Sequence, residues 1–384
     1  MDADSAMKTV FNFTLNLART ALRFVAVELI GRLLFYAGVL YLIGWLRQHI
    51  GRRRLIIPMY HRVRGGDEPA ESRLLDVQRG VPVGLFEQHL RVFRRFGTLA
   101  TLDEAFDRLQ RGTGSSKSVI ALTFDDGYRD NLTLAVPVLN RQGARATIFP
   151  VTRTAGGGRP LWWDELTGVL SRGSINGEGL TPYLAGLERC EPSPRDCASV
   201  GPTASRIAMA QFLCERLVEL PGHQRERIID ELAARLDVAP QASMPGSLRA
   251  ESAAELNAPS IYADWNELRA AADGGFEIGG HTLDHAVLPC EEPTTAYLQI
   301  AGSRTALQQQ LGAAARSFAY PNGRHDAICR ALVSRAGFRL AVATEHGVNY
   351  ASTDPFQLRR MPIGCERPFH LALKLAFYGW AHRG

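Results

Sequence analysis

Apolar and polar positions alternate along this chain so as to predict strands and helices in turn from about residue 55 onward. Continuous apolar runs at 55–60, 118–124 and 146–151 are typical of buried strands. Apolar residues at helical spacing predict helices over 83–96 and 132–141. The second half continues the alternation, with strands expected at 276–279, 317–320, 340–344 and 358–363 and helices at 293–311 and 325–336.

Strands that alternate with helices at this spacing indicate a parallel sheet. No G-x-G-x-x-G turn follows the first strand, so we expect an α/β fold of the distorted (β/α) barrel kind rather than a dinucleotide-binding sheet. Barrel enzymes place their chemistry at the carboxyl ends of the strands. Polar residues fall at those ends here, namely His61, Asp125, Asp126, His281 and Asn322.

The first 54 residues form a separate hydrophobic segment. Its uninterrupted apolar run, 33–46, is shorter than the roughly 20 residues that a spanning helix needs. A membrane-embedded or interfacial helix is the favoured interpretation, and a single span or a helix packed on the catalytic domain are alternatives. Arginines at 52–54 follow the run, so the positive-inside rule predicts that the rest of the chain lies at the cytoplasmic face.

Residues 55–384 are expected to form the catalytic domain, with an insertion at about 171–260. Residues 172–202, at the start of the insertion, are rich in Gly, Pro and Ser, and helical patterns follow at 205–220 and 224–236. The insertion is interpreted either as a lid or substrate-selecting subdomain or as a helical elaboration away from the site.

Composition narrows the function classes. The net charge of +5 over 384 residues is mildly basic, and no nucleic-acid-binding module is recognisable, so we expect no nucleic-acid partner. The six cysteines are scattered without a C-x-x-C pair, which favours reduced thiols in the cytosol. A disulfide between Cys190 and Cys197 is the alternative.

Two short strings carry the candidate chemistry: TFDDG at 123–127 and HTLDH at 281–285. A catalytic zinc commonly keeps three protein ligands and one open position. Two histidines four residues apart and one aspartate can supply such a set. The other aspartate of the first string would remain as a general base for a water molecule.

These strings resemble the first two motifs of the NodB-homology polysaccharide deacetylases, carbohydrate esterase family four. Supporting strings are MYHRV at 59–63, FAYPNG at 318–323 and the stretch that runs into His281. The resemblance implies a distorted (β/α) barrel, with Asp126, His281 and His285 as ligands of a divalent metal and Asp125 as the general base. Zinc is the expected metal, with cobalt or nickel as alternatives.

The third motif departs from the family pattern. Where an arginine that orients the base would stand, the chain has AYPNG at 319–323, similar to a variant of the exopolysaccharide branch. The base-orienting arginine is therefore absent from that position, with Arg316 just before the string and Arg324 just beyond it. The resemblance implies that Tyr320, Pro321 and Asn322 hold the oxyanion or the substrate, and that Trp265 loosely matches a family Asp-Trp element.

The general acid is also out of place, because the late histidine of the family has no counterpart in the stretch 358–362. His61, at the end of the first strand, is the favoured candidate for the general acid. Alternatively, His61 is a hydrogen-bonded structural histidine. His346 and His370 are weaker candidates.

The resemblance implies a metal-dependent hydrolase that removes N-acetyl or related acyl groups from an amino sugar. The expected partner is a carbohydrate, a polysaccharide or a lipid-linked saccharide, with the membrane reached through the N-terminal segment. Two alternatives are a lipid-linked sugar deformylase and a non-catalytic carbohydrate-binding member of an exopolysaccharide assembly.

Overall fold

The computed structural model describes residues 28–50, 52–66, 80–111, 118–172, 202–238 and 260–378. Cys190 and Cys197 lie outside these residues, as do the stretches 173–201 and 239–259 of the predicted insertion. Within the described ranges, Cys214, Cys290, Cys329 and Cys365 are free thiols.

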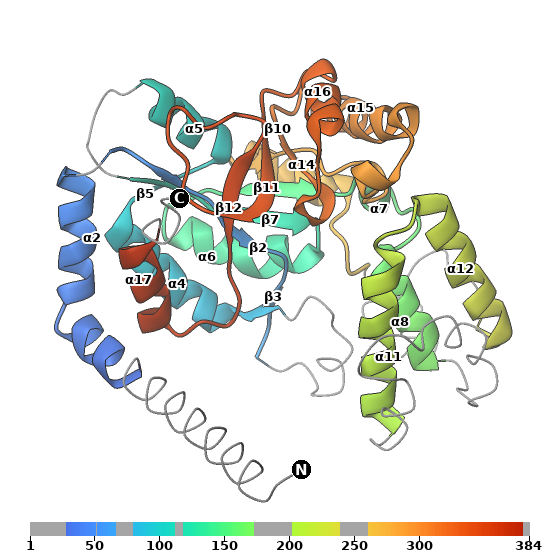
Figure 1. Ribbon diagram of the computed structural model, residues 1–384, viewed down its shortest axis with the longest axis horizontal. Helices are drawn as coiled ribbons and strands as arrows, with labels where there is room; N and C mark the ends of the chain where they lie inside the picture. Colours follow the sequence, from blue (N-terminus) through green and yellow to red (C-terminus); the bar gives the residue numbers. More distant parts are fainter. Residues whose placement is uncertain are drawn as a thin grey trace, which may run out of the picture.

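A seven-stranded parallel sheet forms the centre of the molecule (Figure 1). Its order is β10-β11-β12-β2-β7-β8-β9, and every pairing is parallel. A parallel bridge between Gly280, just after β9, and Phe318 in β10 joins the two ends into a nearly closed barrel. The strands are β2 (Pro58–Tyr60), β7 (Thr123–Asp126), β8 (Thr147–Pro150), β9 (Glu277–Ile278), β10 (Ser317–Ala319), β11 (Leu340–His346) and β12 (Leu358–Pro362).

The predicted barrel fold is confirmed, and most predicted elements are present within a residue or two. Two predicted strands are each divided between sheets. Residues 55–60 supply β1 (Leu55–Ile56) and β2, and residues 118–124 supply β6 (Val119–Ala121) and the start of β7. With β5 (Thr98–Ala100), β1 and β6 form a second sheet, and β3 (Val63–Arg64) pairs with β4 (Val81–Pro82).

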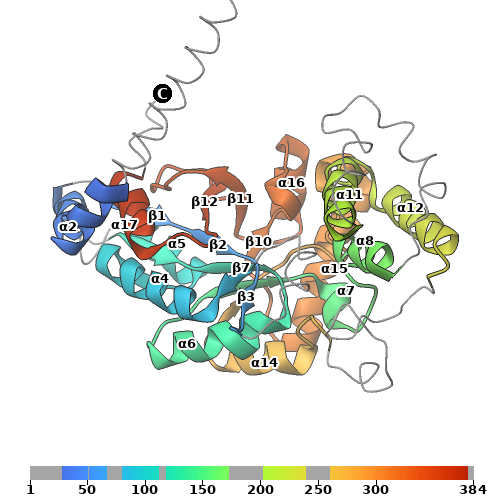
Figure 2. The same ribbon diagram turned by 90° about the horizontal axis from the view of Figure 1, so that it is seen from below.

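Helices cover the barrel, as an α/β fold requires to bury both faces of a parallel sheet (Figure 2). The long predicted helices at 83–96 and 293–311 match α4 (Val83–Phe96) and α15 (Pro293–Leu311). The other described covering segments are α5 (Leu102–Arg111), the π-turn Asn131–Ala135 with α6 (Val136–Arg141), α7 (Thr152–Ala155), α8 (Trp162–Arg172), α14 (Trp265–Asp273), α16 (Ala327–Arg335) and α17 (Pro368–Phe377).

The described part of the predicted insertion consists of α11 (Pro202–Leu217) and α12 (Gly222–Arg235). Both contact α8 and share with it an apolar cluster that includes Leu166, Leu213 and Ile229. These helices lie together at one side of the barrel (Figure 1).

The N-terminal apolar run forms two helical pieces, Glu28–Tyr36 and α2 (Val39–Ile50). In the described part of the chain, no single helix is long and apolar enough to cross a membrane. The pair Glu28–Tyr36 and Val39–Leu46 passes that test only together and is bent by 74°. α2 packs against α4 and α17, so this segment is attached to the barrel.

Candidate metal centre and active site

Asp125 and Asp126 end β7 at the carboxyl edge of the sheet, where they pair in register with Phe149 and Pro150 of β8. Both side chains are buried. Asp126 has a φ of 71°, a left-handed conformation that is uncommon outside glycine and turns the chain sharply. Gly127 follows with a φ of 74°, and a Cβ there would lie 2.8 Å from Pro150 Cα. The turn therefore needs glycine at 127.

The loop after β9 brings two imidazoles to Asp126. His281 Nε2 lies 3.4 Å and His285 Nε2 3.5 Å from Asp126 Oδ1. One ligand atom from each of these three buried residues can be chosen so that all lie within 4.8 Å of one another. His285 itself has a φ of 56°. Two of the three candidate ligands thus have a strained backbone conformation. Such strain is common in residues at functional sites.

The donor set fits a divalent metal. His281 Nδ1 donates to the Ala319 carbonyl at 2.8 Å, which leaves the lone pair of Nε2 facing the cluster. Asp126 Oδ2 and His285 Nδ1 are buried without a hydrogen-bond partner. Buried polar atoms are nearly always satisfied, so the unpaired carboxylate oxygen beside two imidazoles is consistent with a cation at this position. Two histidines and a carboxylate are ligands that zinc accepts.

Asp125 has a different partner, which the sequence did not predict. Arg360 of β12 donates from Nη1 to Oδ1 and from Nη2 to Oδ2, both at 2.7 Å. The same guanidinium donates from Nε to the Ala343 carbonyl at 2.8 Å. Arg360 is completely buried, so a two-pronged ion pair fixes both oxygens of Asp125. The third motif supplies no base-orienting arginine, and the arginine that holds Asp125 comes from another strand.

These contacts set the ionisation of the site. Burial raises the pKa of Asp125, but the charge and hydrogen bonds of Arg360 lower it by more, and a protonated His281 would add to that effect, so the pKa falls below its ordinary value. Burial, with the charge of His281 next to it, lowers the pKa of His285 well below its usual range. Asp125 is thus an ionised carboxylate and His285 a neutral imidazole at neutral pH.

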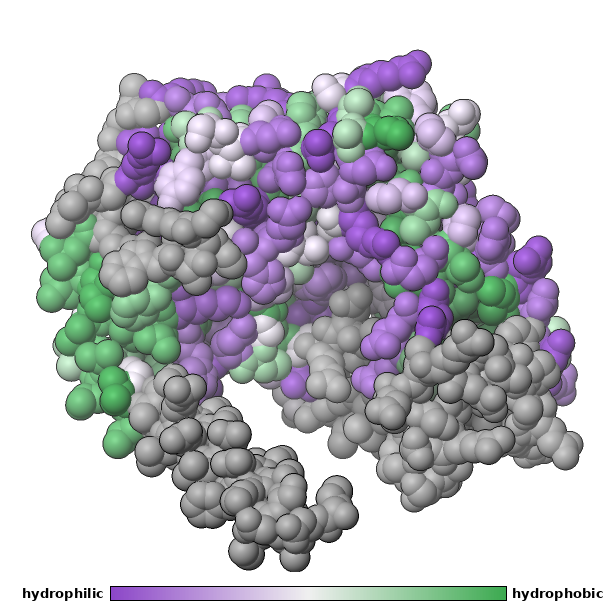
Figure 3. Space-filling view, in the orientation of Figure 1, coloured by the Kyte–Doolittle hydropathy of each residue, from purple (hydrophilic) through white to green (hydrophobic). Residues whose placement is uncertain are grey.

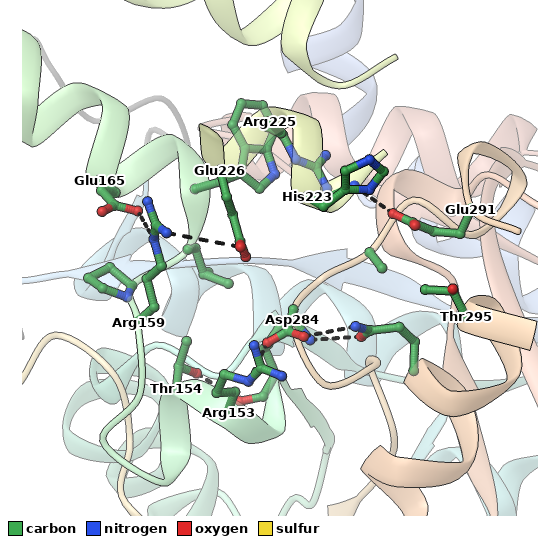
Figure 4. A pocket seen from close by; sticks show the side chains of 17 residues that line it. Arg153, Thr154, Arg159, Glu165, His223, Arg225, Glu226, Asp284, Glu291 and Thr295 are labelled. Atoms are coloured by element: carbon green, nitrogen blue, oxygen red, sulfur yellow. Dashed lines mark hydrogen bonds and ion pairs between the residues drawn. The ribbon is translucent and has the colours of Figure 1, made fainter. Parts of the chain in front are cut away.

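The loop that carries HTLDH (281–285) is held by polar side chains on the side opposite the candidate metal site. Gln299 of α15 accepts hydrogen bonds from the backbone N–H groups of Leu283 and Asp284 and donates to the Asp284 carboxylate at 2.8 Å. Arg153 Nε lies 2.6 Å from the same carboxylate. These groups line a cavity of about 220 Å³ between α8, α12 and the loop (Figure 4). Asp125, Asp126, His281 and His285 do not line this cavity. The cavity therefore lies on the other side of the loop 281–285 from the candidate metal site.

An aromatic network supports His285. The Trp163 ring meets the His285 ring edge-to-face with centroids 4.5 Å apart. Trp163 Nε1 donates to Tyr128 Oη at 2.9 Å, and the hydroxyls of Tyr128 and Tyr262 both donate to Asp164. These hydrogen bonds fix the Trp163 indole, and the fixed ring can hold the imidazole in one orientation.

His61 lies close to the cluster at the end of β2. It is half-buried, and its charge would lower the pKa of both Asp125 and His285. Its backbone carbonyl accepts a hydrogen bond from Asn131 Nδ2 at 2.8 Å, which anchors the strand end. The structure therefore brings His61, Asp125, Asp126, His281 and His285 to one edge of the barrel.

The third motif is placed differently from the expectation. Tyr320 points into the core, where its hydroxyl donates to the Phe356 carbonyl at 3.0 Å. Its backbone N–H donates to Val342, and Pro321 has no N–H. The oxyanion donor assigned to this string can thus come from neither residue. Asn322 is exposed in the loop with a φ of 55°.

The remaining candidates have other contacts. Trp265 lies in the first turn of α14, packs on the barrel core and borders Gly156. His346 ends β11 rather than lying in a loop, and it is exposed. His370 of α17 has its Nε2 2.9 Å from Glu28 of the N-terminal helix.

Two arginines beside the third motif also pair elsewhere, Arg316 with Asp103 and Arg324 with Glu219.

Sequence reasoning missed Arg360, Trp163 and Gln299. For Arg360 a signal was present: two adjacent arginines stand in an otherwise apolar strand, and successive side chains point to opposite faces. One of the pair had to face inward, where a charge needs a partner. No comparable signal marks Trp163 or Gln299.

Comparison with known proteins shows what the barrel is similar to. The family model for polysaccharide deacetylases matches residues 112–177 and 246–341. The matched residues make up less than half of the chain and include both motif strings, so this part of the chain is similar to the polysaccharide deacetylase family. A Bacillus subtilis protein named "Putative polysaccharide deacetylase YxkH" is 31% identical over 121 residues, which cover 31% of this chain. The match spans 40% of the length of that relative.

Solved structures of deacetylases share the fold. The Streptococcus pyogenes deacetylase PplD, solved with acetate, aligns with a TM-score of 0.52 at 18% identity, over 85% of this chain and 99% of that one. IcaB from Ammonifex degensii aligns with a TM-score of 0.50 at 16% identity, over 84% and 97%. At these identities the likeness establishes the barrel fold alone and leaves the substrate to be argued from the site.

Proposed function

We propose that this protein is a metal-dependent hydrolase that removes N-acetyl or related acyl groups from an amino sugar. The observation that carries the proposal is the pair of carboxylates at the end of β7. Asp126 converges with two histidines, whereas Asp125 next to it is held ionised by Arg360. The family match supports hydrolysis of a carbon–nitrogen bond in a carbohydrate.

Each side chain has a defined part in this reaction. Asp126, His281 and His285 would hold the metal, which is zinc in this proposal, with cobalt or nickel as alternatives. When bound there, the metal supplies Lewis acidity toward the acyl carbonyl and lowers the pKa of a water molecule. Asp125 accepts the proton of the attacking water, and Arg360 holds its carboxylate in place.

Release of the sugar requires a proton on the leaving nitrogen. A C–O bond forms, the amide C–N bond breaks, and the products are a carboxylic acid and the free amine. We assign the proton donor to His61, because this half-buried residue follows β2, the strand that pairs with β7, and a charge on its ring would affect the pKa of both Asp125 and His285. Asn322 and Trp265 remain proposed substrate contacts of the exposed rim.

The proposed substrate is a polysaccharide or a lipid-linked saccharide, in line with the exopolysaccharide branch. A specific observation favours the lipid-linked form, including deformylation of such a sugar: the barrel carries an exposed apolar helix pair at its N-terminal side. A non-catalytic carbohydrate-binding role would leave the Asp125–Arg360 pair without a task.

The experiment is acid release from N-acetylglucosamine oligomers and from N-acetylated or N-formylated lipid-linked sugars, with zinc, cobalt, nickel or a chelator. A matched pair of variants, Asp125→Asn and Asp126→Asn, separates the two carboxylates. Asp125→Asn should lower the rate by about 10²- to 10⁴-fold and keep the metal content. Asp126→Asn should lose both the activity and the bound metal. Release that survives the chelator and Asp125→Asn would refute the mechanism, and no release from any sugar would favour the binding role.

A further inference from the structure

The helix pair formed by Glu28–Tyr36 and α2 has one face on the barrel and one face in solvent. Leu40 is fully buried, and Phe35, Tyr41 and Ile43 pack against the core. The opposite face is as apolar as the packed one. Leu33 is 68% exposed and Trp45 52% exposed. Packing on α4 and α17 therefore explains the buried apolar side chains of this segment but not the exposed ones.

Exposed large hydrophobic side chains are concentrated on this part of the described surface. Seven come from the helix pair and one from the end of the adjacent α17: Leu29, Ile30, Leu33, Tyr36, Leu42, Trp45, Leu46 and Phe377. Only two others, Leu298 and Ile328, are as exposed anywhere in the described ranges. The patch is the green area over α2 in Figure 3. Contiguous exposed apolar patches mark interaction sites, whereas scattered ones need no explanation.

Arginines border the patch. A groove of about 670 Å³ runs between the helix pair and the helices α4 and α17, and Arg32, Arg91 and Arg367 line it together with aromatic rings. The Arg32 guanidinium lies 5.4 Å from the centre of the Phe369 ring. Arg95, at the end of α4, lies 5.7 Å from the Tyr41 ring. The apolar face and these exposed cationic groups thus form one amphipathic surface.

Acidic residues on this surface have cationic neighbours. Glu28 lies 2.9 Å from both Arg32 and His370, and Arg367 is 4.0 Å away. Glu87 pairs with Arg91 at 3.0 Å, and that arginine remains largely exposed. The rim therefore offers positive charge beside apolar and aromatic side chains.

We propose that this surface binds in the headgroup region of an anionic bilayer, without crossing it. Aromatic rings and arginine stems beside an apolar face suit the boundary between acyl chains and phosphates. The 12 residues of α2 span about 18 Å, against a hydrocarbon core of about 30 Å, and the 74° bend stops the two pieces from forming one rod.

Charge argues against a second copy as the occupant. In a two-fold dimer the same patch meets itself, so the arginine rim would face an identical rim. An anionic lipid surface instead complements the rim, and such lipids are enriched in the cytoplasmic leaflet. The proposal thereby retains the membrane-associated, cytoplasmic-face localisation expected from the sequence. It does not depend on the proposed hydrolysis.

The test is flotation of the full chain with vesicles of phosphatidylcholine alone or with about one-third phosphatidylglycerol. We expect clear binding to the anionic vesicles and weak binding to the neutral ones. Arg91→Gln with Arg367→Gln should weaken anionic binding by about fivefold for each arginine removed, roughly 25-fold together. Leu33→Glu with Trp45→Glu should abolish binding to both kinds of vesicle.

The matched control is Leu298→Glu with Ile328→Glu, because these side chains are 62% and 54% exposed on α15 and α16. The control variant should float like the natural chain. Equal flotation of the Leu33/Trp45 variant, or binding that ignores vesicle charge, would overturn the proposal. So would a dimer that Leu33→Glu dissociates while vesicle binding is absent. Thermal melting of each variant shows that the barrel remains folded.

Discussion

Asp125 and Asp126 are neighbours at the end of β7, yet their carboxylates have different partners. Arg360 donates to both oxygens of Asp125 at 2.7 Å. Asp126 has one oxygen near two imidazoles and a second oxygen that is buried with no donor. The protein itself satisfies the first carboxylate, whereas the second remains short of positive charge. One strand end thus provides an oriented, ionised base and a set of ligands that a cation would complete.

The largest expected effect is on the Asp125 side. Arg360→Ala leaves a buried carboxylate without its partner, and breaking a buried pair in this way costs about 3–5 kcal/mol. Arg360→Lys keeps the charge but loses the two-pronged geometry, so it should recover stability more than activity. Denaturant unfolding and acid release measure the two effects. Metal content should be unchanged in Arg360→Lys, and its loss would show that the two sides are not separate.

The pH dependence sharpens the same difference. Since Arg360 lowers the pKa of Asp125 below its unfolded value, the pair stabilises the fold above about pH 3.9, and this stabilisation is lost as the pH falls through the lower folded pKa. In Arg360→Gln, burial dominates and raises the pKa of Asp125. Stability of that variant relative to the natural chain should therefore increase as the pH falls toward 4.

Activity provides a second measurement of this shift. The acid limb of kcat/KM should move to higher pH in Arg360→Gln, because the base must lose its proton before it can accept one. Unfolding free energies measured from pH 7 to pH 4 give the stability part. A constant difference between the two proteins over that range, together with an unmoved acid limb, would contradict the role of Arg360.

The two sides of the site also differ in how far the sequence predicted them. Asp126, His281 and His285 lie in two short strings, and the barrel topology brings those strings to one edge. The strand–helix alternation was enough to predict that topology. Arg360 is 235 positions from Asp125, and no local spacing links them. Its partner depends on which side of β12 faces the barrel interior.

The third motif shows a related limit. The string at 319–323 was expected to help hold an oxyanion. Instead, Tyr320, directly after β10, donates its N–H to the Val342 carbonyl of β11. The predicted strand 317–320 already contained Tyr320, but a sequence pattern does not show which neighbouring strand accepts each backbone N–H.

A smaller effect is expected on the Asp126 side, from Gln299. Gln299→Ala removes the acceptor of two loop N–H groups and the donor to Asp284. Leaving such groups unpaired costs about 1–3 kcal/mol. Metal affinity should fall by about 10- to 100-fold, as for other outer partners of a metal site. Gln309→Ala, an exposed residue of the same helix, is the control and should change neither quantity.

The smallest expected effect comes from Trp163→Phe, which keeps an aromatic ring near His285 and removes the indole N–H donated to Tyr128. Loss of one such hydrogen bond costs about 0.5–1.5 kcal/mol. Because the ring contact survives, metal affinity should change by less than the Gln299 effect. Unfolding and metal titration give both numbers. Trp265→Phe on α14 is the control and should leave metal affinity unchanged. If Trp163→Phe lowers metal affinity as much as Gln299→Ala, the indole hydrogen bond rather than the ring contact orients His285.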